Sequence, residues 1–114
     1  MKTIALLFGL SVLSTPALAQ TISATEASAH VGETVTVRGV VDEVHTTGRG
    51  TTFLDLGGTY PDEAFTGVIF SEDAGAFPNA QSLEGRTVDI RGPVQLYHGR
   101  PEIILRSATQ LKPE

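Results

Sequence analysis

The chain has no cysteine and few basic residues, and both shortages exclude classes of protein. Among its 114 residues, 8 are Lys or Arg and 13 are Asp or Glu, which gives a net charge of −5 at pH 7. Without cysteine we expect neither disulfides nor a lipid anchor attached to a thiol. An acidic protein does not attract polyanions at long range, so the overall charge opposes a nucleic-acid partner.

The motifs of common enzymes are also missing. There is no Gly-x-Ser-x-Gly nucleophile motif and no thiol. Gly48 and Gly50 form no phosphate-binding loop, because their segment joins two predicted strands rather than a strand and a helix. The histidines His30, His45 and His98 lack the close spacing of metal ligands. We therefore expect no enzymatic activity, no cofactor and no metal, although a metal site at His45 and His98 stays open if their loops meet.

No apolar run reaches the roughly 20 residues of a membrane-spanning helix. A short run at residues 4–13 follows Lys2 and precedes an Ala-Leu-Ala sequence at 17–19. This order predicts a secretory signal peptide over residues 1–19, cleaved at its end, rather than an N-terminal core helix. The remaining 95 residues, 20–114, carry 7 basic and 13 acidic side chains, a charge of −6. We expect a single domain in the periplasm or the medium, with no membrane insertion after cleavage.

A short helix is predicted near the start of this domain. Ser23 and Glu26 have the spacing of a capping box, and Gly32 is placed to end the helix, so we expect it over residues 24–30. From Thr34 onward, apolar residues alternate with polar ones, as in a strand with one buried face. Four further strands are expected at residues 51–56, 64–70, 87–97 and 102–106.

Two ten-residue segments resemble each other: GETVTVRGVV at residues 32–41 and GRTVDIRGPV at residues 85–94. Nothing else recurs at this interval, so we interpret them as two strands with the same structural demands rather than as a solenoid repeat. In the first, Gly39 and the shift of phase before Val44 predict a bulged, bent strand. In the second, Pro93 has no N–H and predicts a bulge or an unpaired edge.

Five short strands with little helix predict an all-β domain, and their order fits one architecture. The OB-fold is a five-stranded Greek-key barrel whose long first strand bends sharply so that it pairs on both sides. Gly39 lies in the middle of the first predicted strand, and the longest connection joins the third and fourth strands. We therefore predict a five-stranded Greek-key OB-fold barrel with a short N-terminal helix, in which the first and fourth strands are neighbours.

Four segments carry a resemblance to a known family: ISATEASAHVGETVTVRGVV, TTFLDLGGTYP, AFTGVIFSED and YHGRPEIILRSATQL. Together they span nearly the whole mature chain, residues 22–111. The chain resembles small exported bacterial OB-fold proteins related to the tRNA-anticodon-binding type. This resemblance implies an OB-fold and nucleic-acid binding, which is attributed to such proteins largely by analogy of fold. The layout is also similar to that of small periplasmic OB-fold stress proteins, without a matching motif.

The OB-fold also predicts where a ligand would bind. Ligands lie on the face of strands two and three, between the loops that join strands one to two and four to five. Here those loops are residues 45–50 and 97–101, whose polar residues are either ligand contacts or ordinary turn surface. Phe53 resembles the aromatic residue that stacks on a base in anticodon-binding domains. It is therefore either a stacking residue or a residue covered by the N-terminal helix or a loop. The candidate ligand-binding residues are Phe53, His45, Arg49, Tyr60, Phe70, Tyr97, His98 and Arg100.

Charged residues elsewhere are expected to be ordinary surface. Asp62 and Glu63 are most simply solvated loop carboxylates. Arg38 and Arg91 occupy matching positions in the two similar segments and are expected to be surface charges or members of cross-strand pairs.

Two functions stay open at this point. The first, which is the leading hypothesis, is an exported, non-catalytic OB-fold module that binds single-stranded nucleic acid or another stacked anionic ligand through Phe53 and the two loops. The second is a periplasmic OB module of the stress-protein type, which binds a protein, a small ligand or a cation and has no nucleic-acid role. The acidic charge and the export signal favour the second.

Overall fold

The computed structural model describes residues 20–114, so the predicted signal peptide lies outside the described residues. The strands are β1 (Thr21–Ile22), β2 (Thr34–Thr46), β3 (Thr52–Leu56), β4 (Phe65–Ile69), β5 (Thr87–Pro93), β6 (Gln95–Tyr97), β7 (Arg100–Ile104) and β8 (Leu111–Pro113). The short 3-10 helices are η2 (Ala24–His30), η3 (Ser71–Ala76), η4 (Ala80–Leu83) and η5 (Ala108–Gln110). The described chain is all-β with little helix, as predicted. No helix within it is long and apolar enough to cross a membrane.

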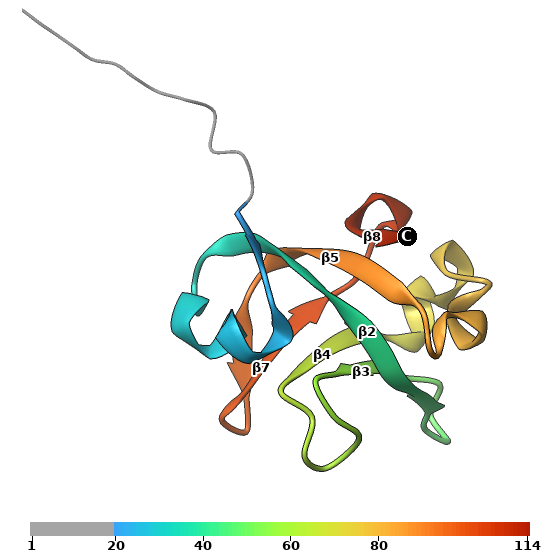
Figure 1. Ribbon diagram of the computed structural model, residues 1–114. Coiled ribbons are helices and arrows are strands. Elements are labelled where there is room, and N and C mark those ends of the chain that lie inside the picture. The colour runs from blue at the N-terminus through green and yellow to red at the C-terminus, as the bar shows by residue number, and fades with distance from the viewer. Residues whose placement is uncertain (1–19) are drawn as a thin grey trace, which may run out of the picture.

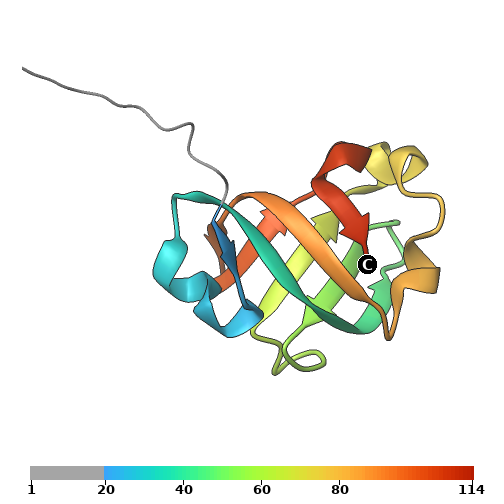
Figure 2. The same cartoon turned by 45° about the horizontal axis from the view of Figure 1, so that its top comes forward.

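The strands form one sheet in the order β6-β7-β4-β3-β2-β5-β8, with β1 beside β2. The β1–β2 and β4–β7 pairs are parallel, and the others are antiparallel. Figures 1 and 2 show that the sheet curls, so that β2 and β5 cross over β3, β4 and β7. Within the described residues no ladder joins β5 to β7, so the sheet is curled rather than closed. This arrangement is compatible with an OB-like fold.

Eight strands form where five were predicted, and the difference has local causes. The predicted strand over residues 87–97 divides into β5 and β6 at Val94, directly after Pro93, which has no N–H to continue the ladder. Pro93 pairs with Thr34 at the very start of β2, so it ends a regular ladder rather than forming the predicted bulge or unpaired edge. The other additions, β1 and β8, have only 2 and 3 residues, too few to show a periodic pattern.

β2 is the long, bent strand that the sequence predicts. It pairs first with β5 and, from Val41, with β3, and its register against β3 shifts between Val41 and Glu43. This bulge explains why the next buried residue is Val44, one place out of phase. A side chain at Gly39 would begin 3.2 Å from Leu56 Cδ2, so glycine allows β2 to cross closely over β3.

β2 and β5, which contain the two similar segments, pair about a local two-fold axis. Val37 lies opposite Ile90, its counterpart in the other segment. At one end of the pair, the N–H of Gly32 donates to the carbonyl oxygen of Val94 at 2.8 Å. At the other end, the N–H of Gly85 donates to the carbonyl oxygen of Val41 at 2.7 Å. The prediction that these two strands are neighbours is therefore confirmed. The similarity of the two ten-residue segments reflects one pairing geometry, which is used at both ends of the strand pair.

A charged pair lies on the outer surface of this two-strand unit. Arg38 Nε donates to Asp89 Oδ1 at 2.7 Å, and its Nη2 donates to Oδ2 at 2.9 Å. The hydrogen bonds from Arg38 lower the pKa of Asp89. Glu114 adds a second carboxylate 3.3 Å from Arg38 Nη2, while Arg91 is exposed. The expected cross-strand pair is therefore confirmed for Arg38.

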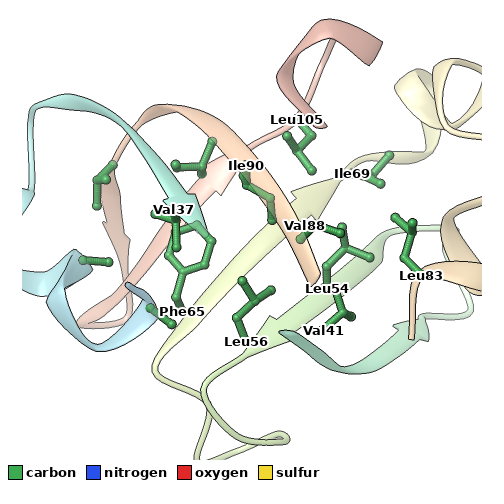
Figure 3. Packing of buried hydrophobic residues seen from close by; sticks show 14 of the residues in the cluster. Val37, Val41, Leu54, Leu56, Phe65, Ile69, Leu83, Val88, Ile90 and Leu105 are labelled. Atoms are coloured by element: carbon green, nitrogen blue, oxygen red, sulfur yellow. The ribbon is translucent and has the colours of Figure 1, made fainter. Parts of the chain in front are cut away.

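The core lies inside the curl of the sheet, as Figure 3 shows. Large side chains from both halves of the curl are fully buried there, among them Val37, Val41, Leu54, Leu56, Phe65, Ile69, Val88, Ile90, Ile103 and Leu105. Because Leu54 and Leu56 point into this core, Phe53 and Asp55 lie on the opposite face of β3.

The helix predicted over residues 24–30 is present as η2, although in the tighter 3-10 form. The backbone N–H of Ser23 donates to the Glu26 carboxylate at 2.8 Å, as the capping pattern predicts. Ala24 and Ala27 are buried, so one side of η2 packs on the core. η2 thus covers an end of the curl and leaves the outer face of β3 to other residues.

Candidate ligand-binding groove

A groove runs along the outer face of the sheet and is formed by two adjoining hollows. One has a volume of about 240 Å³ and the other of about 250 Å³, and they share Phe53, Tyr97 and Glu102 as lining residues. The first, which also contains Asp55 and Glu63, is called the carboxylate hollow below. The second is called the arginine hollow; its other lining residues are Thr47, Arg49, Thr51, Val68 and Phe70.

All eight residues predicted as ligand contacts line this groove. The carboxylate hollow contains His45, Phe53, Tyr60, Tyr97, His98 and Arg100, and the arginine hollow contains Arg49, Phe53, Phe70 and Tyr97. The structure therefore brings them together, and their role in binding stays a prediction.

Three of the residues in the predicted loops lie on strands: His45, Arg100, and Tyr97, which was also the predicted last residue of a strand. β2 is longer than expected, so His45 pairs directly with Phe53 of β3. Tyr97 pairs with Arg100 across the β6–β7 hairpin, whose turn contains His98. Strand register, rather than loop conformation, fixes their positions.

The walls of the groove are aromatic and imidazole rings. The rings of Phe53 and His45 stack, with centroids 5.0 Å apart and an interplanar angle of 23°. Tyr60 tilts against the same imidazole at 6.0 Å, and Tyr97 stacks on His98 at 4.1 Å. Tyr60 and Tyr97 are 67% and 60% exposed, so much of each ring is open. Phe53 is half-buried and lines both hollows, so the N-terminal helix does not enclose it.

The arginine hollow combines a cation with apolar rings. Arg49 is exposed, and within the described chain its side chain makes neither a hydrogen bond nor an ion pair. It lies on the tight turn between β2 and β3, where the N–H of Gly50 donates to the oxygen of Thr47 at 2.9 Å. Phe70, 37% exposed, lines the same hollow. This arrangement suits a flat ligand that carries a negative charge.

The carboxylate hollow contains an ion pair that the sequence did not indicate. Glu63 was expected to be solvated, but its side chain is only 7% exposed, and Arg100 Nη1 lies 2.7 Å from its Oε2. Thr66 Oγ1 donates to the same oxygen at 3.3 Å, and Arg100 Nη2 donates to the carbonyl of Pro61. The charge of Arg100 is thus compensated, so this residue adds less positive charge to the groove than expected.

Asp55 is the most unusual residue of the groove. Its side chain is 1% exposed, and His45 Nε2 lies 3.2 Å from its Oδ2. This contact lacks hydrogen-bond geometry, so both oxygens of Asp55 are buried without a donor. Burial raises the pKa of Asp55 to about 6, and His45 opposes this rise. A carboxylate in such a place is costly for the fold, which is typical of a functional site.

The three carboxylates of the groove, Asp55, Glu63 and Glu102, were not among the residues predicted from the sequence. Glu102, also buried, accepts a hydrogen bond from Gln95 Nε2 at 2.8 Å. A signal was available for Asp55, because it is an acidic residue inside the apolar strand FLDL. Within residues 20–114, no three His, Asp or Glu side chains are arranged to hold a metal ion.

The sequence matches no protein-family model and no curated protein sequence. Solved structures do resemble the fold. A chain from Leishmania major Friedlin, classed as an aspartyl-tRNA synthetase, superimposes with a TM-score of 0.57 and 17% identity over 88% of this chain and 21% of its own.

Two proteins from Entamoeba histolytica give similar values. Its aspartyl-tRNA synthetase has a TM-score of 0.54 and 20% identity, over 81% of this chain and 21% of its own. Its asparaginyl-tRNA synthetase has a TM-score of 0.53 and 20% identity, over 85% of this chain and 23% of its own. This chain therefore spans about a fifth of the length of these synthetases, and the likeness concerns the fold.

Proposed function

We propose that this chain is an exported, non-catalytic module with a five-stranded Greek-key OB-fold, in which β5 and β6 together form the fourth strand and β1 and β8 are additions, and that it binds single-stranded nucleic acid. The groove carries the proposal, because its open rings lie on the face where OB-folds bind ligands. The likeness to synthetases whose names give tRNA as their substrate supports the same class of ligand. Export is inferred from residues 1–19 alone.

The groove supplies the two kinds of contact that single strands require. Bases that stack on aromatic rings gain about 1–3 kcal/mol each, without sequence readout. Tyr97 lines both hollows and is well exposed, so we assign it to stacking. Arg49 is available to a phosphate. Because the mature chain has a charge of −6, we expect weak, salt-sensitive and sequence-tolerant binding.

The carboxylates favour a second candidate, a small ligand or protein segment that carries N–H donors or positive charge. Asp55, Glu63 and Glu102 line one hollow, and the compensated Arg100 is the only Lys or Arg among its lining residues. A cation held between these carboxylates and the open tyrosine rings would gain both ionic and cation–π energy. This candidate needs no nucleic acid and fits the acidic net charge.

The first experiment is fluorescence anisotropy with labelled single-stranded DNA and RNA at low salt. Tyr97→Ala is expected to weaken binding about tenfold, because it removes the ring on which one base would stack. Leu96→Ala is the matched control: Leu96 is the adjacent residue on the same strand, is 51% exposed, and lines neither hollow. Absence of binding at tens of micromolar protein would reject the nucleic-acid proposal, as would equal losses in the two variants.

A second pair of variants tests the phosphate contact. Arg49→Ala is expected to weaken binding at all sequences and to reduce the slope of log affinity against log salt by about 1. Arg91→Ala removes an exposed arginine of β5 that lines neither hollow, and should leave the slope unchanged. If spermidine binds by calorimetry and oligonucleotides do not, the second candidate is preferred.

A further inference from the structure

The carboxylate hollow contains acceptor atoms that the fold leaves without donors. Both oxygens of Asp55 and the Oε1 of Glu63 are buried, and none of them accepts a hydrogen bond within residues 20–114. The two side chains are 1% and 7% exposed, and both line the hollow. Because a buried, unpaired carboxylate oxygen lowers stability, three such atoms at one site indicate that their donors come from a ligand.

The charges of the hollow favour a cationic ligand. Its lining includes Asp55, Glu63 and Glu102, whereas Arg100 is the only Lys or Arg among the lining residues. Arg100 is already paired with Glu63 at 2.7 Å, and Glu102 already accepts a hydrogen bond at 2.8 Å. The charge of Asp55 is not matched in this way, since His45 lies 3.2 Å from Oδ2 without a hydrogen bond. A cation bound here would supply both the missing charge and the missing donors.

We propose that the carboxylate hollow is a subsite for a guanidinium group, whose N–H donors bind the unpaired oxygens of Asp55 and Glu63. This inference deepens the second candidate function and rests on it. A guanidinium has five N–H donors in one plane and matches a carboxylate with two parallel hydrogen bonds. It is also more weakly hydrated than an ammonium group, so it enters a buried site at lower cost.

The walls and the size of the hollow fit a planar group. The rings of Tyr60 and Tyr97 line it and are well exposed, so they are open to a ligand. Guanidinium planes stack on such rings, which adds cation–π energy. The volume of about 240 Å³ is below the roughly 300–1,000 Å³ of sites that enclose a whole small molecule. The hollow therefore suits one group of a ligand rather than all of it.

A ligand can reach Asp55 at the place where His45 contacts it. The imidazole is 35% exposed and is stacked on Phe53 at 5.0 Å. Because it makes no hydrogen bond to Asp55, a ligand N–H can take its place without breaking one. Arg49 lines the other hollow and not this one, so a guanidinium bound here leaves the proposed phosphate contact free.

The test is an NMR titration of the ¹⁵N-labelled protein with methylguanidinium chloride at constant ionic strength. At about pH 7.5 Asp55 is ionised, because its pKa is about 6. We expect saturable shifts at the backbone amides around Asp55 and Glu63, with a dissociation constant on the order of 1 mM, because so small a ligand makes few contacts. Methylammonium should bind about tenfold more weakly. Equal affinity for the two ions, or shifts that do not saturate, overturns the inference.

Two variants test the role of Asp55. Asp55→Asn should weaken methylguanidinium binding about tenfold, because it removes the charge and replaces an acceptor with a donor. Removal of a buried charge does not unfold the protein, so a loss of binding is not a loss of fold. Glu43→Gln is the control: it removes a carboxylate near Asp55 that lines neither hollow, and should bind like the wild type. Equal losses in the two variants overturn the inference.

Two peptides identify the source of the guanidinium. An acetylated and amidated Gly-Arg-Gly peptide represents a protein segment, and the matching Gly-Lys-Gly peptide is its control. Tighter binding of the arginine peptide than of methylguanidinium identifies a protein segment, and equal binding identifies a small guanidinium compound. A preference for the lysine peptide overturns the inference.

The result is separate from that of the proposed function. If spermidine binds by calorimetry but methylguanidinium does not bind, the second candidate stands and the guanidinium subsite is rejected. If oligonucleotides bind and methylguanidinium does not, the subsite is again rejected and the nucleic-acid proposal stands.

Discussion

Two groups of charged side chains, one on the β2–β5 surface and one in the groove, are built in opposite ways. On the surface, Arg38 donates to both oxygens of Asp89, at 2.7 and 2.9 Å. In the groove, Asp55 has no donor for either buried oxygen, and Glu63 has none for its Oε1. The surface pair satisfies its carboxylate at little cost, whereas buried and unpaired carboxylate oxygens lower stability. The difference indicates that the groove is arranged for something other than folding.

The largest expected change in stability comes from breaking the Glu63–Arg100 pair. Arg100→Ala leaves the buried Glu63 without its cation, so we expect the free energy of unfolding to fall by about 3 kcal/mol. The measurement is urea unfolding followed by circular dichroism. Adding Glu63→Gln should recover part of the loss, because no uncompensated charge is then left. Arg106→Ala, at an exposed position after β7, is the control. A loss in Arg100→Ala no larger than that of the control contradicts the comparison.

A smaller change in stability, a gain rather than a loss, is expected when Asp55 is replaced. The pKa of this buried group is raised from 3.8 to about 6, so stability falls as pH rises from about 4 to about 6, and the full cost remains at higher pH. Asp55→Asn should therefore stabilise the protein by about 2 kcal/mol at neutral pH. The gain should be absent at about pH 2.5, where the carboxyl is protonated in both the folded and the unfolded state. Unfolding curves at the two pH values check this, and a gain that does not change with pH would contradict it.

The smallest change in stability is expected when the Arg38–Asp89 pair on the β2–β5 surface is broken. Arg38→Ala and Asp89→Asn should leave the unfolding midpoint close to that of the wild type, because an exposed pair is screened by water and salt. A double-mutant cycle on this pair should give a smaller coupling than a cycle on Glu63 and Arg100. The comparison between the two regions fails if the order of the couplings is reversed.

Much of the fold could be predicted because its signals are local. The capping pattern at Ser23 and Glu26 predicted η2, and Gly39 with the phase slip before Val44 predicted the bulge in β2. Pro93 marked the end of β5. The two short strands β1 and β8 could not be predicted, because two or three residues show no periodicity and these strands are defined only by their pairing with β2 and β5.

The candidate groove could be predicted only in part. Its rings follow from the strand pattern and the OB topology, and all eight of the predicted residues line it. Its buried acids could not be inferred in the same way. Glu63 is buried because Arg100 reaches it from β7, 37 residues along the chain, and such a long-range contact leaves no local signal.

The two-fold axis between β2 and β5 also affects how separate chains can meet. Because Val37 faces its own counterpart, each of the two strands carries a pairing pattern that a second copy of itself would match. Two copies of β5 would even place Asp89 opposite Arg91 on both sides, which favours contact between unfolded chains. Pro93 interrupts such a ladder at its end, since it offers no N–H. We therefore expect the same proline that ends β5 within the fold to limit self-association before the fold is complete.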